Sequence, residues 1–119
     1  HLIKKYIIKK FSTKGIACKT IRFNNSLAYS SRNFLLSKKD IKKASSVSLM
    51  LKNLYNSLKK NLANKKKILN LKKKINLLNV KIEYLEIRNK FNFTRKFNKS
   101  NFKIFISFYI NKVRLIDNF

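Results

Sequence analysis

A stripe of apolar residues at helical spacing runs through residues 37–90, a stretch that contains neither Gly nor Pro. In its first half the stripe consists of Ile41, Ala44, Val47, Leu51, Leu54, Leu58 and Leu62. In its second half it continues as Ile68, Leu71, Ile75, Leu78, Ile82 and Leu85. Because residues three and four positions apart share one face of an α-helix, both halves predict an amphipathic helix.

The stripe slips between Leu62 and Ile68, across one Asn and three Lys residues. Two alternatives follow: a bend or short loop that makes a helical hairpin, or one long basic helix whose apolar face rotates. A single helix would be roughly 75 Å long at about 1.5 Å per residue, which this chain alone could not bury. The start of the helical region is better defined, because Ser37 and Asp40 have the spacing of a capping box.

After Lys90 the apolar pattern changes to a period of two. Phe91, Phe93 and Phe97 alternate with polar residues, and residues 102–110 alternate in the same way. Residues 98–101 between them are rich in Asn and Ser, which favour turns. The pattern predicts a β-hairpin with a four-residue loop. Since two strands alone are only marginally stable in water, this hairpin must pack on the helical region or join a neighbour's sheet.

The chain before residue 37 shows no long periodic pattern. It contains many lysines, a break at the single Gly15, and an Asn- and Ser-rich stretch over residues 24–33. That stretch is either an ordinary surface loop or an extended segment suited to contact with folded RNA. We therefore expect an α+β fold in one small domain: a basic N-terminal arm and loop over residues 1–36, a helical region over 37–90, and a β-hairpin with a basic tail over 91–119.

Charge changes this picture most. The 119 residues include 30 Lys and Arg but only four acids, which gives a net charge of +26. A compact chain with this charge repels itself, so a polyanionic partner is expected to neutralise it. Nucleic acid, an anionic membrane surface and an acidic protein are the candidate partners.

Side chains for catalysis are scarce. The only His is residue 1 and the only Cys is Cys18. Since we expect a His at residue 1 not to be held rigidly, neither a Cys/His pair nor a Ser/His/Asp triad is predicted. Glu83 and Glu86 lie among cations and are better explained as ion-pair partners than as a catalytic pair. From these residues we expect no enzyme activity, no catalytic residues, no bound metal and no cofactor.

Composition adds an indication of origin. Gly occurs once and Pro and Trp not at all, whereas Lys, Asn, Ile and Phe are abundant, as in proteins encoded by AT-rich genomes. A small, very basic chain with helices, a small sheet and basic arms resembles the ribosomal proteins of mitochondria or plastids. The resemblance implies a structural constituent of an organellar ribosome, in the mitochondrial matrix or a plastid. Its partners would be ribosomal RNA and neighbouring ribosomal proteins, with no small-molecule substrate and no transmembrane segment.

Cations in nearly every segment could contact RNA phosphates. The candidate RNA-binding residues are Lys9, Lys10, Lys14, Lys19, Arg22, Arg32, Lys38, Lys39, Lys59, Lys60, Lys65, Lys66, Lys67, Lys72, Lys73, Lys74, Arg95, Lys96 and Lys99. Aromatic residues beside them could stack on unpaired bases, namely Tyr29, Phe34, Tyr55, Phe91 and Phe97. Two alternative functions remain open: a basic accessory subunit of an organellar membrane complex, and a nucleoid-type DNA-binding protein.

Overall fold

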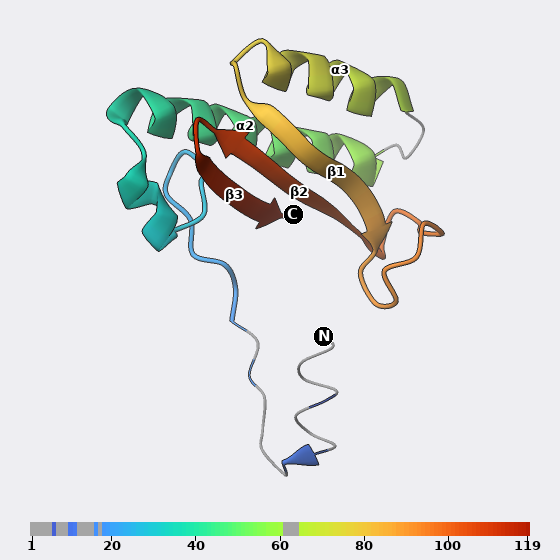
Figure 1. Ribbon diagram of the computed structural model, residues 1–119. Helices are drawn as coiled ribbons and strands as arrows, with labels where there is room; N and C mark the ends of the chain where they lie inside the picture. Colours follow the sequence, from blue (N-terminus) through green and yellow to red (C-terminus); the bar gives the residue numbers. More distant parts are fainter. Residues whose placement is uncertain (1–5, 7–9, 12–15, 17, 61–64) are drawn as a thin grey trace.

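Two α-helices pack on one face of a three-stranded antiparallel sheet (Figure 1). The computed structural model describes residues 6, 10, 11, 16, 18–60 and 65–119. The elements are a 3₁₀-helix η1 (Ser31–Leu35), α2 (Lys38–Lys60), α3 (Lys65–Asn76), β1 (Lys81–Asn89), β2 (Phe102–Ile110) and β3 (Val113–Asn118). The strands lie in the order β1-β2-β3, and both pairs are antiparallel. The predicted α+β class is confirmed.

Helix α2 begins where the capping box predicted. The Ser37 Oγ accepts a hydrogen bond from the Asp40 backbone N–H at 3.1 Å and donates one to Asp40 Oδ2 at 2.8 Å. One face of the helix is buried against the sheet, as the first half of the stripe predicted; its buried apolar residues are Ala44, Val47, Leu51, Leu54 and Leu58. This half of the helical prediction is confirmed as far as Leu58, while Leu62 lies outside the described residues.

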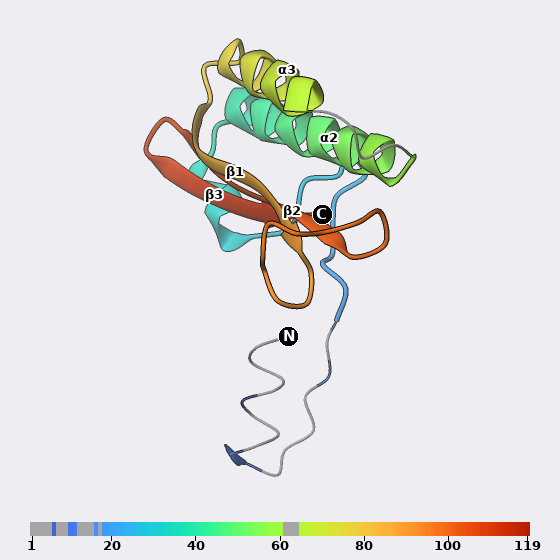
Figure 2. The ribbon, with the colours of Figure 1, turned by 90° about the vertical axis from the view of Figure 1, so that its right-hand side faces the viewer.

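The helical region consists of two helices and not of one. Helix α2 ends at Lys60 and α3 begins at Lys65, while residues 61–64 lie outside the described part of the chain. The two helices lie side by side and form one layer over the sheet, as Figures 1 and 2 both show. The helical hairpin is therefore the correct alternative, and the single long helix is wrong.

The prediction that the helical region extends to residue 90 is also wrong. Helix α3 ends at Asn76, and Asn79, with φ of 55°, turns the chain into β1. Asn enters the left-handed region more readily than most residues, so it ends this helix without a Gly. The sequence of the turn therefore carries none of the Gly or Pro residues that usually mark a break.

A β-bulge explains why strand β1 looked helical. Ile82 pairs with Phe108 and Leu85 with Ile106, so a step of three residues on β1 faces a step of two on β2. The extra residue lies at the irregularity between Ile82 and Tyr84. Because a bulge shifts the alternation of side chains by one residue, Ile82 and Leu85 both face the helices despite their helical spacing.

The predicted hairpin is correct in one strand only. Residues 102–110 form β2 as expected, but residues 91–97 form a loop, and the predicted basic tail contains β3 instead. The alternating aromatic residues of the loop pack on both sides of the end of the sheet. Phe93 contacts Phe105 edge-on with centroids 5.9 Å apart, and Phe97 lies 6.2 Å from Phe102. Their spacing therefore serves loop packing and not strand pairing.

The core lies between the helix layer and the sheet. Its fully buried large side chains come chiefly from α2, α3 and the central strand: Val47, Leu51, Leu58, Ile75, Ile104, Ile106, Phe108 and Ile110. The tight turn between β2 and β3 is tied to the start of α2, because Asn111 Nδ2 donates to Asp40 Oδ2 at 3.0 Å. Within the predicted basic arm and loop over residues 1–36, residues 1–5, 7–9, 12–15 and 17 lie outside the described part of the chain. The division into three regions remains a prediction.

Candidate functional site

The segment from Ile21 to Tyr29 folds back on itself beside β3. Arg22 and Ala28 form an isolated antiparallel bridge, and the Tyr29 backbone N–H donates to Ile21 O at 3.1 Å. At the tip, Ser26 adopts a φ of 72° and its N–H donates to Phe23 O at 2.9 Å. The result is a compact loop where we had expected an irregular stretch.

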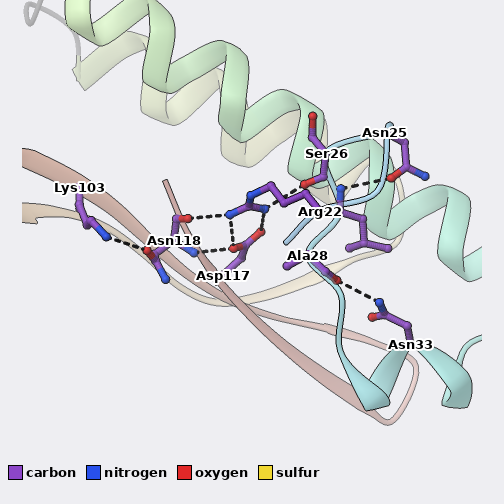
Figure 3. Close-up of polar contacts among 9 residues, drawn as sticks. Arg22, Asn25, Ser26, Ala28, Asn33, Lys103, Asp117 and Asn118 are labelled. Atoms are coloured by element: carbon purple, nitrogen blue, oxygen red, sulfur yellow. Dashed lines mark hydrogen bonds and ion pairs between the residues drawn. The ribbon is translucent and has the colours of Figure 1, made fainter. Parts of the chain in front are cut away.

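Arg22 holds this loop to the last strand (Figure 3). Its guanidinium donates to both carboxylate oxygens of Asp117, at 2.7 and 2.8 Å, and to the backbone oxygens of Ser26 and Asn118, each at 2.9 Å. The guanidinium also lies 4.1 Å from the centroid of the Phe119 ring. The Asp117 side chain is only 7 % exposed. Such a bidentate pair fixes orientation as well as position.

Beside the loop lies a concavity with aromatic walls. The rings of Phe23 and Tyr29 are stacked, with centroids 3.7 Å apart and planes inclined by 23°. Together with Phe34 and Ile41 they line a concavity of about 620 Å³. Tyr29 is 57 % exposed and Phe34 is 91 % exposed. Large aromatic surfaces left open to solvent in one place mark a contact site for a ligand or for protein.

Ser30, Ser31 and Asn33, at the start of η1, line the same concavity, whereas Arg32 in the same turn lines a separate, smaller cavity. Ser30 caps η1, and its Oγ accepts from the Arg32 backbone N–H at 3.3 Å. Ser30, Ser31 and Arg32 are exposed, and no carboxylate among the described residues pairs with the Arg32 guanidinium. Asn33 is buried, and its Nδ2 donates to Ala28 O at 3.0 Å, which joins η1 to the loop.

We define this combination of loop, concavity and η1 as the 23–34 site. An aromatic concavity suits a flat apolar group, whereas hydroxyls and a guanidinium suit an anionic group. Within the described residues, no three His, Cys, Asp or Glu side chains gather as metal ligands. No described helix is both long and apolar enough to cross a bilayer.

The predicted RNA-binding cations are widely spread over the surface. Arg32 belongs to the 23–34 site, and Arg22 anchors it. Lys9 and Lys14 lie outside the described residues, and nothing is described of the Lys65 side chain. The remaining cations are exposed or half-buried around the molecule: Lys10, Lys19, Lys38, Lys39, Lys59, Lys60, Lys66, Lys67, Lys72, Lys73, Lys74, Arg95, Lys96 and Lys99. Their role as phosphate contacts remains a prediction that the structure does not test.

Two features of the site were missed in the sequence. The adjacent hydroxyls of Ser30 and Ser31 were not singled out from the sequence, although the Arg that follows them and the aromatic residues on either side distinguish them from an ordinary loop. Asp117 was also missed. It lies 95 positions from Arg22, so no local pattern could have paired the two.

Comparisons with known proteins identify the family. The profile of the family described as Pantoate-beta-alanine ligase matches residues 2–119. Pantothenate synthetase of Francisella tularensis subsp. mediasiatica is 35 % identical over 99 % of this chain and 38 % of its own length. The enzyme of Clostridium acetobutylicum is 34 % identical over 92 % of this chain and 40 % of its own length. The chain therefore spans about two fifths of the length of these relatives.

Solved structures agree with this assignment. The Francisella tularensis Pantoate-beta-alanine ligase, complexed with beta-gamma ATP and beta-alanine, has a TM-score of 0.69 and 34 % identity. It covers 99 % of this chain, which matches 38 % of the solved chain. The Thermus thermophilus pantothenate synthetase has a TM-score of 0.78 over 98 % of this chain and 44 % of its own, and at 20 % identity it supports the fold alone.

These findings overturn the ribosomal interpretation. The expected ribosomal RNA and protein partners, the organellar location and the absence of enzyme activity and of a small-molecule substrate were wrong, and neither alternative function gains support. A high net charge describes the whole surface and does not identify a ligand, so it was a weak basis for function. The chain belongs to the pantoate–β-alanine ligase family.

Proposed function

We propose that this chain forms the nucleotide-contacting part of an ATP-dependent ligase that joins pantoate to β-alanine. Such a ligase forms an amide bond between a carboxyl group and an amino group and couples it to cleavage of ATP. Family membership supports the reaction, and the Francisella tularensis structure supports ATP and β-alanine as its ligands. Because the chain spans about two fifths of its relatives, we assign to it a share of the active site only.

One observation carries the assignment to the 23–34 site. A nucleotide combines a flat base with an anionic phosphate chain. The concavity combines an open aromatic surface with the hydroxyls of Ser30 and Ser31, and the Arg32 guanidinium belongs to the same 3₁₀ turn. The concavity of about 620 Å³ lies in the range typical of small-molecule sites. We infer that the base packs near Tyr29 and that Arg32, with Ser30 and Ser31, binds the phosphates.

The anchoring of the site fits this role. Arg22 is held by Asp117 on β3, so the loop that carries Tyr29 is fixed to the sheet before a ligand arrives. Donors that are already in place lose little conformational freedom when a ligand binds, which favours affinity. The backbone that carries the proposed phosphate contacts is therefore anchored to the sheet through Arg22 and to the loop through Asn33.

The test is nucleotide binding by the protein at its native length, in about 0.15 M salt, where charges beyond roughly 8 Å are screened. We expect Arg32→Gln to weaken binding of a non-hydrolysable ATP analogue about 10- to 100-fold, because a hydrogen bond to a charged group contributes about 1.5–3 kcal/mol. Lys96→Gln removes the same charge from the exposed loop beyond β1 and should change affinity less than about twofold.

Equal losses in the two variants would show that binding depends on net charge alone and would refute the assignment. The reaction is tested separately by mass spectrometry of pantothenate formed from pantoate, β-alanine and ATP. Arg32→Gln should lower that rate, whereas Lys96→Gln should not. A wild-type protein that binds the analogue but forms no pantothenate would contradict the proposed reaction.

A further inference from the structure

A small cavity lies between η1, α2 and β3, and its lining includes the buried Asn33 and Ser48 as well as the exposed Arg32 and Ile116. Its volume is about 40 Å³, and residues from the 27–30 loop, η1, α2, β2 and β3 line it. The lining is partly apolar, with Phe108 and Leu115, and partly polar, with Asn33 and Ser48. A cavity needs roughly 10–15 Å³ to hold one water molecule, so this one has room for a water but not for an organic ligand.

Two polar side chains at this cavity have an unused hydrogen-bonding atom. Asn33 is 8 % exposed and Ser48 is 1 % exposed. The Asn33 Nδ2 donates to Ala28 O, but Asn33 Oδ1 has no partner among the described residues, and neither has Ser48 Oγ. Buried polar atoms are almost always hydrogen-bonded, to protein or to ordered water.

Neighbouring serines on α2 show that the Ser48 hydroxyl is a special case. Ser45 donates to Ile41 O at 2.8 Å and Ser46 to Lys42 O at 3.0 Å, each to the carbonyl four residues earlier. This local bond satisfies a serine hydroxyl within a helix. Ser48 lacks it and lines the cavity instead.

We propose that a buried water molecule occupies this cavity and bridges Asn33 Oδ1 to Ser48 Oγ. A water donates one hydrogen bond to Asn33 Oδ1 and either donates to or accepts from Ser48 Oγ, so both atoms gain a partner. A cation fits poorly, because the nearby Asp117 carboxylate is already bound by Arg22 through both oxygens. A neutral molecule of this size that both donates and accepts is water.

This bridge would position η1 on α2. Asn33 lies within the same 3₁₀ turn as Ser31 and Arg32, so a water that holds its side chain also limits the movement of that turn. Asn33 and Ser48 would then be positioning residues for the 23–34 site. This consequence rests on the proposed function, whereas the presence of the water does not.

The test compares Ser48→Ala with Ser46→Ala. Both make the same substitution in the same helix, so changes in helix propensity are shared. Ser46→Ala also removes the bond to Lys42 O, so a larger loss in Ser48→Ala is a stringent sign of an interaction at the cavity. With water present, Ser48→Ala removes one of its partners, and Tm should fall about 3–5 °C below that of Ser46→Ala. In a dry cavity the same change removes an unpaired hydroxyl, and Tm should match or exceed that of Ser46→Ala.

A high-resolution crystal structure gives a direct second measurement. An ordered solvent peak within about 2.6–3.2 Å of both atoms supports the bridge. Empty density there, or a higher Tm of Ser48→Ala, would overturn it. These readouts do not involve the nucleotide, so failure of the water and failure of the proposed function can be told apart. If both proposals hold, Ser48→Ala should also weaken analogue binding, whereas Ser46→Ala should leave it unchanged.

Discussion

The ion pair between Arg22 and Asp117 should contribute more to stability than any other ion pair in the described part of the chain. We predict that Arg22→Met lowers the free energy of unfolding by about 3 kcal/mol. Removing one partner of a buried pair typically costs about 3–5 kcal/mol, because the other charge is left buried and unpaired. The lower value applies here, since the Arg22 side chain is 21 % exposed while that of Asp117 is 7 % exposed.

A second variant distinguishes the loss of the ion pair itself from the cost of leaving the Asp117 charge buried and unpaired. In Arg22→Met combined with Asp117→Leu, no charge is left without a partner, and the loss should fall below about 2 kcal/mol. The remaining loss reflects the hydrogen bonds that Arg22 donates to Ser26 O and Asn118 O. The double variant should therefore be more stable than Arg22→Met, although it carries one more substitution.

The assay is urea unfolding followed by far-ultraviolet circular dichroism. A matched control is Arg88→Met, because Arg88 and Glu86 also approach to 2.7 Å, but Glu86 is 43 % exposed. That variant should lose less than about 1 kcal/mol. Equal losses for Arg22→Met and Arg88→Met, or a double variant less stable than Arg22→Met, would refute the view that the buried Asp117 determines the energy.

Two further predictions concern α2. Leu51 is fully buried and Leu49 is 49 % exposed, so Leu51→Ala should cost about 2–5 kcal/mol and Leu49→Ala less than about 0.5 kcal/mol in the same urea assay. Hydrogen bonding from Ser37, and then interactions with Lys43 and Asn111, lower the pKa of Asp40 below its ordinary value of 3.8. The contribution of the Asp40 carboxylate to stability should therefore be complete above pH 3.8 and lost as the pH falls through the lowered pKa. Asp40→Asn should abolish this part of the acid dependence. An NMR titration that gives Asp40 a pKa above 3.8 would contradict the prediction.

The sequence predicted those elements whose patterns are local. The start of α2 was visible because Ser37 and Asp40 lie three residues apart and bond to each other. Strand β2 was visible because it is central and its apolar residues alternate without a bulge. Strand β1 was hidden, since its bulge gives Ile82 and Leu85 a helical spacing. A pattern of period two or 3.6 cannot represent a strand with one extra residue.

The candidate site was harder to predict, because it depends on contacts between distant residues. The sequence indicates Tyr29, Phe34 and Arg32 individually as candidate RNA contacts, but nothing in it places the two rings around one concavity or Arg32 in the turn beside them. That arrangement depends on the Arg22–Asp117 pair, which joins the two ends of the described fold. The residue types were recognised, while their assembly and their ligand were not.

The compositional bias that makes glycine scarce adds to both the structural and the functional error. Four residues other than Gly have positive φ: Ser26, Asn79, Phe93 and Asn111, among the described residues. Each lies at a turn, where Gly is the usual choice because other residues are disfavoured in this conformation.

The same compositional bias that removes Gly enriches Asn and Lys, so turns carry no glycine signal and the surface gains charge. Without a glycine signal, the turn between α3 and β1 was read as a continuation of the helix. The added charge made a member of an enzyme family resemble a nucleic-acid-binding protein. For such a chain, the pairing of residues across the fold is better evidence of function than composition, because pairing depends on geometry and composition on the genome.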